Sequence, residues 1–179
     1  GAGCANVPLT ISNSTIAFNS TRLGVVGGLA VYGSGHDPTP EVTIESSIMA
    51  KNFIVTDTGV ATAGNDLSRG IPRVAGHNNL IMSAGSVPAD TRRDDPLLLP
   101  LADNGGPTLT HAPAAGSPAI DAGANAGHLD FDQRGAPRVA GAAPDIGAVE
   151  VQPGTSAVPF IGPGFTGNWY DASHVGHGF

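Results

Sequence analysis

The sequence predicts an all-β chain in which about three parallel coils stack on one another and a loop-rich C-terminal cap covers them. Two observations indicate this fold class. The strand-like stretch LTISNSTIAFN at residues 9–19 recurs as VTIESSIMAKN at residues 42–52. In the second half of the chain, residues 94–150, closely spaced turn pairs such as Asn104-Gly105 and Ala136-Pro137 leave no room for a helix of ordinary length.

The two copies align without a gap at an offset of 33 residues. The aligned pairs are Leu9 with Val42, Thr10 with Thr43, Ile11 with Ile44, Ile16 with Met49, Ala17 with Ala50 and Asn19 with Asn52. A second step of the same length places Asn79 at Ser46 and Met82 at Met49. Each copy is rich in β-branched residues, which is typical of strands. Self-similarity at a fixed period indicates stacked units.

Polar residues interrupt the strand alternation at equivalent places in the three copies. Asn13, Ser46 and Asn79 predict a corner, because Asn and Ser tolerate a left-handed backbone and their side chains can bond from coil to coil. Asn19 and Asn52 predict a second corner of the same kind. The sequence therefore assigns these five residues a structural role along the stack.

A wall of 33 residues would enclose more space than side chains can fill, so part of each repeat is expected to leave the wall as a loop. Residues 33–40 and roughly 57–73 are the expected loops, and residues 27–32 are an expected wall strand. We also expect the chain to be cut from a longer protein, with an open edge on its first coil.

Four short motifs occur in order along the second half: LADNGGPTLTH at 101–111, SPAIDAG at 117–123, DQRGAPR at 132–138 and DIGAVE at 145–150. Together they resemble the choice-of-anchor Q domain, over about residues 94–150. In bacterial proteins this domain typically closes a right-handed parallel β-helix, pectate-lyase-like in fold, on the exported face of the cell. The resemblance implies that fold and a secreted or cell-surface location. It implies architecture rather than a particular activity.

The expected organisation has four parts. Residues 1–93 form the coils, truncated at their N-terminal end, and residues 94–150 form the cap laid over the end of the stack. Residues 151–163 are a linker rich in Pro and Gly, and residues 164–179 resemble the start of an aromatic C-terminal module. Trp169 and Tyr170 offer a platform for stacking a sugar ring, although we favour a role in the core of that module.

Charge and composition exclude several classes of function. The net charge is −7 and Lys51 is the only lysine, so nucleic-acid binding and attachment to an anionic membrane by a basic segment are not expected. No apolar stretch is long enough to insert into a membrane, and no signal-peptide pattern opens the chain. Cys4 stands alone, which excludes a disulfide framework. We favour a buried, inert thiol over pairing with a cysteine upstream.

The carboxylates of the second half allow two interpretations. Asp130, Asp132 and Asp145 are candidate calcium ligands, because Ca²⁺ takes six to eight oxygen ligands. We favour structural use, with Asp132 or Asp145 paired to Arg134 or Arg138, because Asp beside Gly or Pro is typical of turns. No other cofactor is expected. A calcium-stabilised cap remains an alternative.

Catalytic patterns are absent from the sequence. The outward wall candidates Ser12, Ser14, Glu45 and Lys51 include no recognisable nucleophile and base, and no G-x-S-x-G elbow occurs. The pair His174–His177 lacks a visible third ligand for a zinc site. No residue is therefore assigned a catalytic role.

Two functions fit these observations. The leading hypothesis is a non-enzymatic structural or adhesive segment of an exported bacterial cell-surface β-helix, with polysaccharide as the candidate ligand. The alternative is the C-terminal fragment of a carbohydrate-active enzyme, a polysaccharide lyase or glycoside hydrolase, whose catalytic coils lie upstream. Converging carboxylates in one groove would favour the enzyme, whereas a ladder of neutral polar side chains would favour the structural segment.

Overall fold

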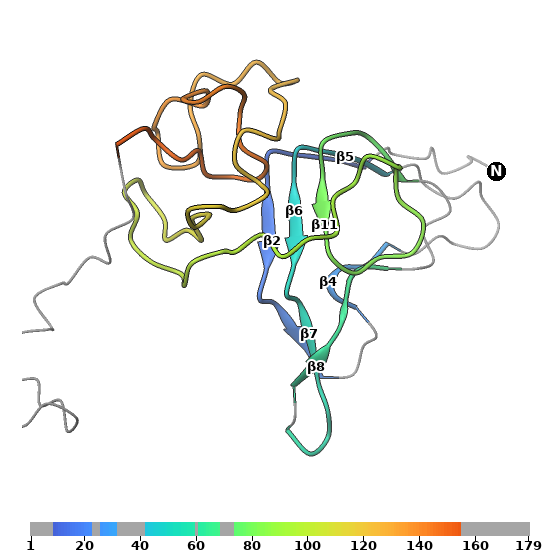
Figure 1. Ribbon diagram of the computed structural model, residues 1–179. Coiled ribbons are helices and arrows are strands. Elements are labelled where there is room, and N and C mark those ends of the chain that lie inside the picture. The colour runs from blue at the N-terminus through green and yellow to red at the C-terminus, as the bar shows by residue number, and fades with distance from the viewer. Residues whose placement is uncertain (1–8, 23–25, 32–41, 60, 69–73, 155–179) are drawn as a thin grey trace, which may run out of the picture.

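The computed structural model describes residues 9–22, 26–31, 42–59, 61–68 and 74–154 (Figure 1). Over these residues the protein is all-β, with short strands β1 to β11 and no helix, and hence no helix that could cross a membrane. Several expectations fall outside the described residues: those for Cys4, the loop at 33–40, most of the linker at 151–163, and the module with Trp169, Tyr170, His174 and His177.

Parallel strands from successive repeats form the first sheet. Its order is β1 (Leu9–Ser12), β5 (Val42–Glu45) and β10 (Val74–Ala75). Leu9 lies opposite Val42 and Ile11 opposite Ile44, which confirms the predicted register between the first two copies. The strands are parallel because each copy re-enters the sheet in the same direction after a long connection.

The second sheet has the order β11 (Leu80–Ile81), β6 (Ile48–Ala50) and β2 (Thr15–Ala17). Ile16 lies opposite Met49, as predicted. The predicted position of the third copy is wrong by one residue, because Ile81 and not Met82 lies opposite Met49. The third coil repeats the second at an offset of 32 residues, as the bond from Ser47 to Asn79 also shows.

Two further sheets complete the coils. The order β3 (Ser20–Thr21), β7 (Phe53–Val55) and β8 (Ala61–Ala63) combines a parallel pair with an antiparallel hairpin, β7–β8. The parallel pair β4 (Val26–Leu29) and β9 (Asn65–Leu67) forms the fourth sheet. The wall strand expected at 27–32 is present in part, because β4 ends at Leu29. The expected loop at 57–73 is wrong in part, because β8 and β9 lie within it.

Strand β6 separates two hydrophobic cores. Met49 packs into a cluster with Val42, Ile44, Leu67 and Ile81. Its neighbours Ile48 and Ala50 point to the opposite face and join Leu80 in a second cluster with Leu98, Ala119 and Ile146 of the C-terminal half. Side chains alternate across a strand, so three consecutive buried residues require cover on both faces.

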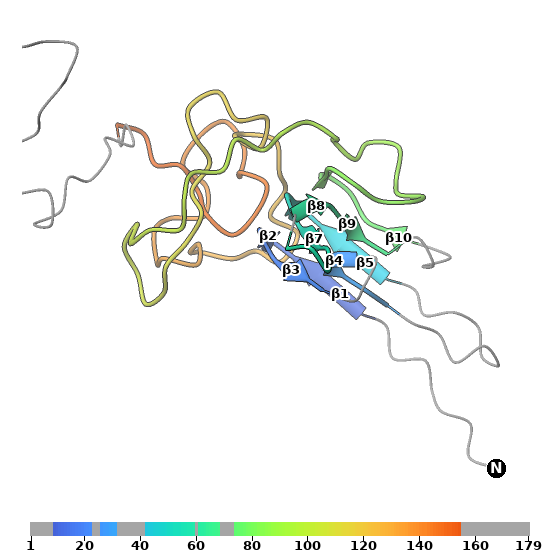
Figure 2. The ribbon, with the colours of Figure 1, turned by 90° about the horizontal axis from the view of Figure 1, so that it is seen from below.

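The C-terminal half, residues 94–150, provides the second cover. It lies beside the β11–β6–β2 sheet in both views (Figures 1 and 2). Gly147 N donates to Ser46 O at 2.8 Å and Ala148 N donates to Thr15 Oγ1 at 3.1 Å. Gly147 has a φ of 105°, and a Cβ there would lie 2.8 Å from Thr15 Oγ1. Only glycine permits this approach to the sheet.

The expected position of this half, over the end of the coil stack, is therefore wrong. The third coil is covered instead by the segment around Arg92, which forms a parallel bridge with Leu80. Arg92 N donates to Asn79 O at 2.8 Å and Ile81 N donates to Arg92 O at 2.9 Å. The apolar outer face of β6 and β11 explains the lateral position, because exposed apolar area is costly in water.

An ion pair tests this lateral position. Lys51 Nζ lies 2.9 Å from Asp95 Oδ1 and joins the second coil to the start of the C-terminal half. Because Lys51 is the only lysine, a zero-length carbodiimide reagent is expected to condense its amine with the Asp95 carboxylate. Peptide mass spectrometry would identify the joined Lys51 and Asp95 peptides.

The variant Lys51→Arg is the matched control, since it keeps the charge but removes the amine that can be acylated. It should lose the crosslink. A crosslink from Lys51 mainly to a carboxylate outside residues 94–150 would contradict the lateral packing.

Candidate functional site

A left-handed residue marks the first corner of each coil. Asn13, Ser46 and Asn78 have φ values of 45°, 46° and 56°. The first two follow directly after β1 and β5, where the chain turns toward the second sheet. The third corner lies at Asn78, one residue before the predicted Asn79, because the third coil is offset by 32 and not by 33 residues.

The residue after each corner links one coil to the next. Ser14 N donates to Ser47 Oγ at 3.1 Å, and Ser47 N donates to Asn79 Oδ1 at 3.0 Å. Asn79 Nδ2 also donates to Ile44 O, so its amide both accepts from and donates to the second coil. Ser47 and Asn79 are fully buried, where an unpaired N–H would be costly.

A second ladder runs through the other predicted corner. Asn19 N and Nδ2 both donate to Asn52 Oδ1 at 3.0 Å. Asn52 N and Nδ2 then donate to Asp66 Oδ1 at 3.0 and 2.7 Å. Asp66 Oδ2 accepts from Ser83 N at 2.9 Å. A continuous line of polar side chains therefore crosses the stack.

Sequence reasoning did not find Asp66. Burial raises the pKa of this carboxyl, although hydrogen bonds from Asn52 and Ser83 act in the opposite direction. Asp66 lies on β9, within the stretch that the sequence predicted to be loop, and no aligned copy pointed to it. The repeat could not reveal it, because β9 pairs with β4 with a register shift.

The first coil presents the same acceptors at its outer edge. Ser14 Oγ donates to Ser12 O at 2.7 Å, just as Ser47 Oγ donates to Glu45 O at 2.9 Å. The two hydroxyls are therefore oriented alike. Ser47 Oγ accepts an N–H from the preceding coil, whereas Ser14 Oγ accepts none within the described part of the chain. Strands β1, β2 and β3 each lie at one edge of their sheets.

These two serines form a matched pair for mutation. We expect Ser47→Ala to lower the free energy of unfolding by about 1–2 kcal/mol, because the Ser14 N–H loses its acceptor. Ser14→Ala removes only the local bond to Ser12 O and should cost less than about 0.5 kcal/mol. Urea denaturation of both variants measures the difference, and equal losses would contradict the ladder.

A buried charge cluster organises the C-terminal half. It consists of Asp132, Arg134, Arg138, Asp145 and Glu150. The expected pairing of Asp132 with Arg134 is present, because Arg134 Nε and Nη2 donate to Asp132 Oδ2 at 2.9 and 2.7 Å. The carboxylate of Asp132 is fully buried and also accepts from Glu150 N at 3.0 Å.

Arg138 connects this cluster to the first coil. Its Nη2 donates to Asn13 Oδ1 at 2.8 Å and to Asp145 O at 2.9 Å. The expected pairing of Arg138 with Asp145 thus uses the backbone carbonyl. Burial lowers the pKa of Arg138, and the charges of Glu150, Asp145 and Asp132 oppose that effect. Its Nε and Nη1 have no protein acceptor among the described residues.

Asp145 and Glu150 accept hydrogen bonds from the backbone of loops that have no strand partners. Asp145 accepts from Asp121 N at 2.8 Å and from Val151 N at 2.7 Å. Glu150 accepts from Ala140 N at 3.0 Å and from Asp145 N at 2.8 Å. Burial raises the pKa of both carboxyls against these hydrogen bonds. Sequence reasoning missed Glu150, although it ends the DIGAVE motif.

The calcium candidates do not gather into a site. Asp130 is exposed, and both oxygens of Asp132 and of Asp145 already accept N–H groups. A calcium ion needs several oxygens that face one point. Among the described residues, no group of three or more His, Cys, Asp or Glu is placed to hold a metal ion.

Asp132 makes stability depend on pH in a defined direction. Burial opposes its ionisation, but hydrogen bonds from Glu150 N and Arg134, with the charge of Arg134, outweigh burial and lower its pKa. Its contribution is therefore present above the ordinary aspartate pKa of about 3.9 and is lost as the pH falls below it. We expect Asp132→Asn to lower the free energy of unfolding by about 3 kcal/mol at neutral pH.

The difference between the wild type and Asp132→Asn should shrink as the pH falls from about 6 toward 3. The raised pKa values of Asp145 and Glu150 act in the opposite direction in both proteins, so the difference isolates Asp132. Denaturation at several pH values provides the measurement, and the exposed Asp94→Asn controls for net charge. A difference that grows on acidification would contradict the assignment.

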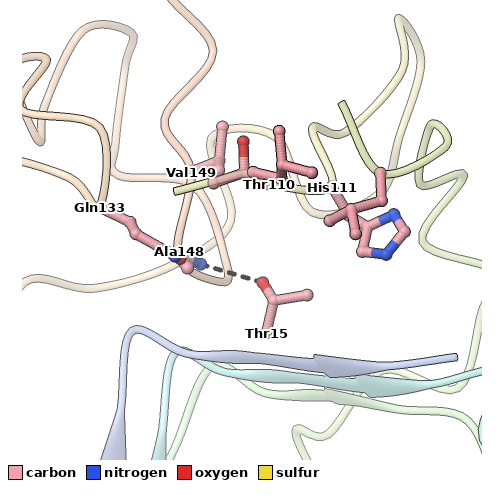
Figure 3. A pocket seen from close by; sticks show the side chains of 8 residues that line it. Thr15, Thr110, His111, Gln133, Ala148 and Val149 are labelled. Atoms are coloured by element: carbon pink, nitrogen blue, oxygen red, sulfur yellow. Dashed lines mark hydrogen bonds between the residues drawn. The ribbon is translucent and has the colours of Figure 1, made fainter. Parts of the chain in front are cut away.

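A groove lies where the edge strand β2 meets the C-terminal half. It encloses about 140 Å³ and is lined by Thr15, Leu101, Leu109, Thr110, His111, Gln133, Ala148 and Val149. Figure 3 shows Thr15 reaching from the sheet toward Ala148, with Thr110 and His111 on the other side. Four of these residues belong to the LADNGGPTLTH motif, which sequence reasoning used only as a family signature.

The outward wall residues do not converge in the described part of the chain. Glu45 Oε2 accepts from His77 N at 3.1 Å, and Lys51 is paired with Asp95. Ser14 Oγ donates to Ser12 O at the end of β1. No protein-family model, curated protein or solved structure matches this chain.

Proposed function

We propose that this chain is a non-enzymatic structural and adhesive segment of an exported bacterial cell-surface or secreted protein. In this proposal residues 9–93 are the last coils of a right-handed parallel β-helix. Residues 94–150 act as a choice-of-anchor Q-like module that fastens those coils from the side. The parallel sheets and the register of the first two copies support the β-helix.

The main support for the proposal is the arrangement of hydrogen-bond acceptors at the outer edge of the first coil. In the first ladder the N–H of each coil donates to a side-chain oxygen on the following coil, and Asn19 N donates to Asn52 Oδ1 in the same direction. Ser14 Oγ and Asn19 Oδ1 repeat this arrangement at the first coil. They are suited to accept N–H groups from a further parallel coil, which would pair with β1, β2 and β3.

The fastening role rests on contacts to all three coils. Residues 94–150 bond to Asn13 and Thr15 in the first coil, to Ser46 in the second, and to Asn78 in the third. Stacked repeats fray from their ends, since each coil is held only by its neighbours. A module that contacts several coils at once opposes this fraying. Such a module suits a segment that bears load at a surface.

Adding a coil tests the proposal. A second copy of residues 9–41 is inserted directly before Leu9, so that the added coil lies one 33-residue repeat upstream. We expect the free energy of unfolding to rise by a few kcal/mol and the denaturant m-value to increase, because more surface is buried. Urea denaturation followed by circular dichroism provides both quantities.

The variant Ser14→Ala supplies the internal control. In the extended chain it removes an acceptor that the added coil uses, so it should cost about 1 kcal/mol more than in the original chain. An added coil that leaves stability unchanged, or a Ser14→Ala cost that is equal in the two chains, would contradict the proposal.

A further inference from the structure

The groove beside β2 has the size of a single ring. Its volume of about 140 Å³ is several times what a single water molecule needs. Pockets for drug-sized ligands begin at about 300 Å³. The groove therefore suits one sugar residue or another small ring, and it is too small for a folded peptide segment.

The lining of the groove is uncharged. It contains no Asp, Glu, Lys or Arg among the described residues, although the chain carries a net charge of −7. A charged ligand would lose its hydration there and find no opposite charge. A neutral ligand avoids this cost.

Both apolar and polar groups line the groove. Leu101 and Leu109 remain 54% and 55% exposed at its edge. Thr110, His111 and Gln133 bring hydroxyl, imidazole and amide groups to the same space. A pyranose ring has apolar C–H faces and a rim of hydroxyl groups, so it matches this combination. A purely apolar ligand would leave the polar groups without partners.

The hairpin that carries Thr110 and His111 is held in place by its own hydrogen bonds. Ala102 and Thr110 exchange backbone hydrogen bonds of 3.1 and 3.0 Å. Asn104 Nδ2 closes the turn by donating to Thr110 O at 2.9 Å and to Thr110 Oγ1 at 3.0 Å. The groove is therefore formed before a ligand arrives, which reduces the entropy cost of binding.

His111 offers an oriented acceptor. Its Nδ1 lies 2.8 Å from Leu99 O, and since a carbonyl only accepts, Nδ1 carries the hydrogen. In the neutral ring Nε2 is then the acceptor, and no described residue bonds to it. Phe18 stacks against the imidazole at 4.6 Å between ring centroids, which limits rotation of the ring. A sugar hydroxyl is a suitable donor to Nε2.

From these features we infer that the groove binds one neutral sugar residue of a polysaccharide, in preference to an acidic sugar. Leu101 and Leu109 contact a C–H face of the ring, and His111, Thr110 and Gln133 bond to its hydroxyls. The inference deepens the proposed adhesive role by assigning it a site and a class of ligand.

A glycan array with neutral and acidic polysaccharides tests the inference on the unmodified chain. We expect binding to at least one neutral glycan and none to polygalacturonate. In NMR titrations with that neutral glycan, Gln133→Ala and Leu109→Ser should each weaken binding by about tenfold. Both side chains are exposed, so thermal melts should show an intact fold.

The matched control is Leu129→Ser, which removes an exposed leucine outside the groove and should leave binding unchanged. Failure to bind any neutral glycan, preference for an acidic glycan, or binding unaffected by the two groove variants would overturn the inference. This outcome is independent of the coil-addition experiment. If the added coil fails to stabilise the chain but the groove variants weaken sugar binding, the β-helix proposal fails and the sugar site stands.

Discussion

The structure depends on how each coil satisfies its backbone at the corners. A left-handed residue at Asn13, Ser46 or Asn78 turns the chain from the first sheet toward the second. After the first and second corners, an N–H lies between two strands, and a side-chain oxygen on the next coil accepts it. An unpaired N–H in the buried stack would cost as much as a strand hydrogen bond contributes. This requirement explains why Ser and Asn recur at the corners.

The C-terminal half also has to satisfy its buried backbone N–H groups, and it does so without strands. Its loops contain few regular backbone pairs, so Asp132, Asp145 and Glu150 act as acceptors for the N–H groups of neighbouring loops. A carboxylate suits this role because it accepts only and offers two oxygens. The arginines offset the charge that these carboxylates bring into the interior. The same saturation with N–H donors makes them poor calcium ligands.

The groove follows from the packing of these two parts. Strand β6 needs cover on its outer face, and residues 94–150 provide it while holding Thr15 at the edge of the sheet. The hairpin at 101–111 then meets β2 without filling the space between them. A binding site at a seam between two packed parts is common, because neither part is shaped there by its own core.

The sequence alone determined the all-β class, the parallel stacking of the first two copies at 33 residues, the polar corners, and a small set of Asp–Arg pairings that includes Asp132 with Arg134. These features arise from local or periodic patterns, which are visible in one dimension. The tertiary structure decided the shift of the third coil, the lateral position of residues 94–150, and the roles of Asp66, Glu150 and the groove. The lateral position and the groove depend on which face of β6 is covered and by what, and no local pattern carries that information. Apolar residues on both faces of a strand show that two partners are needed, but only packing decides which segments they are.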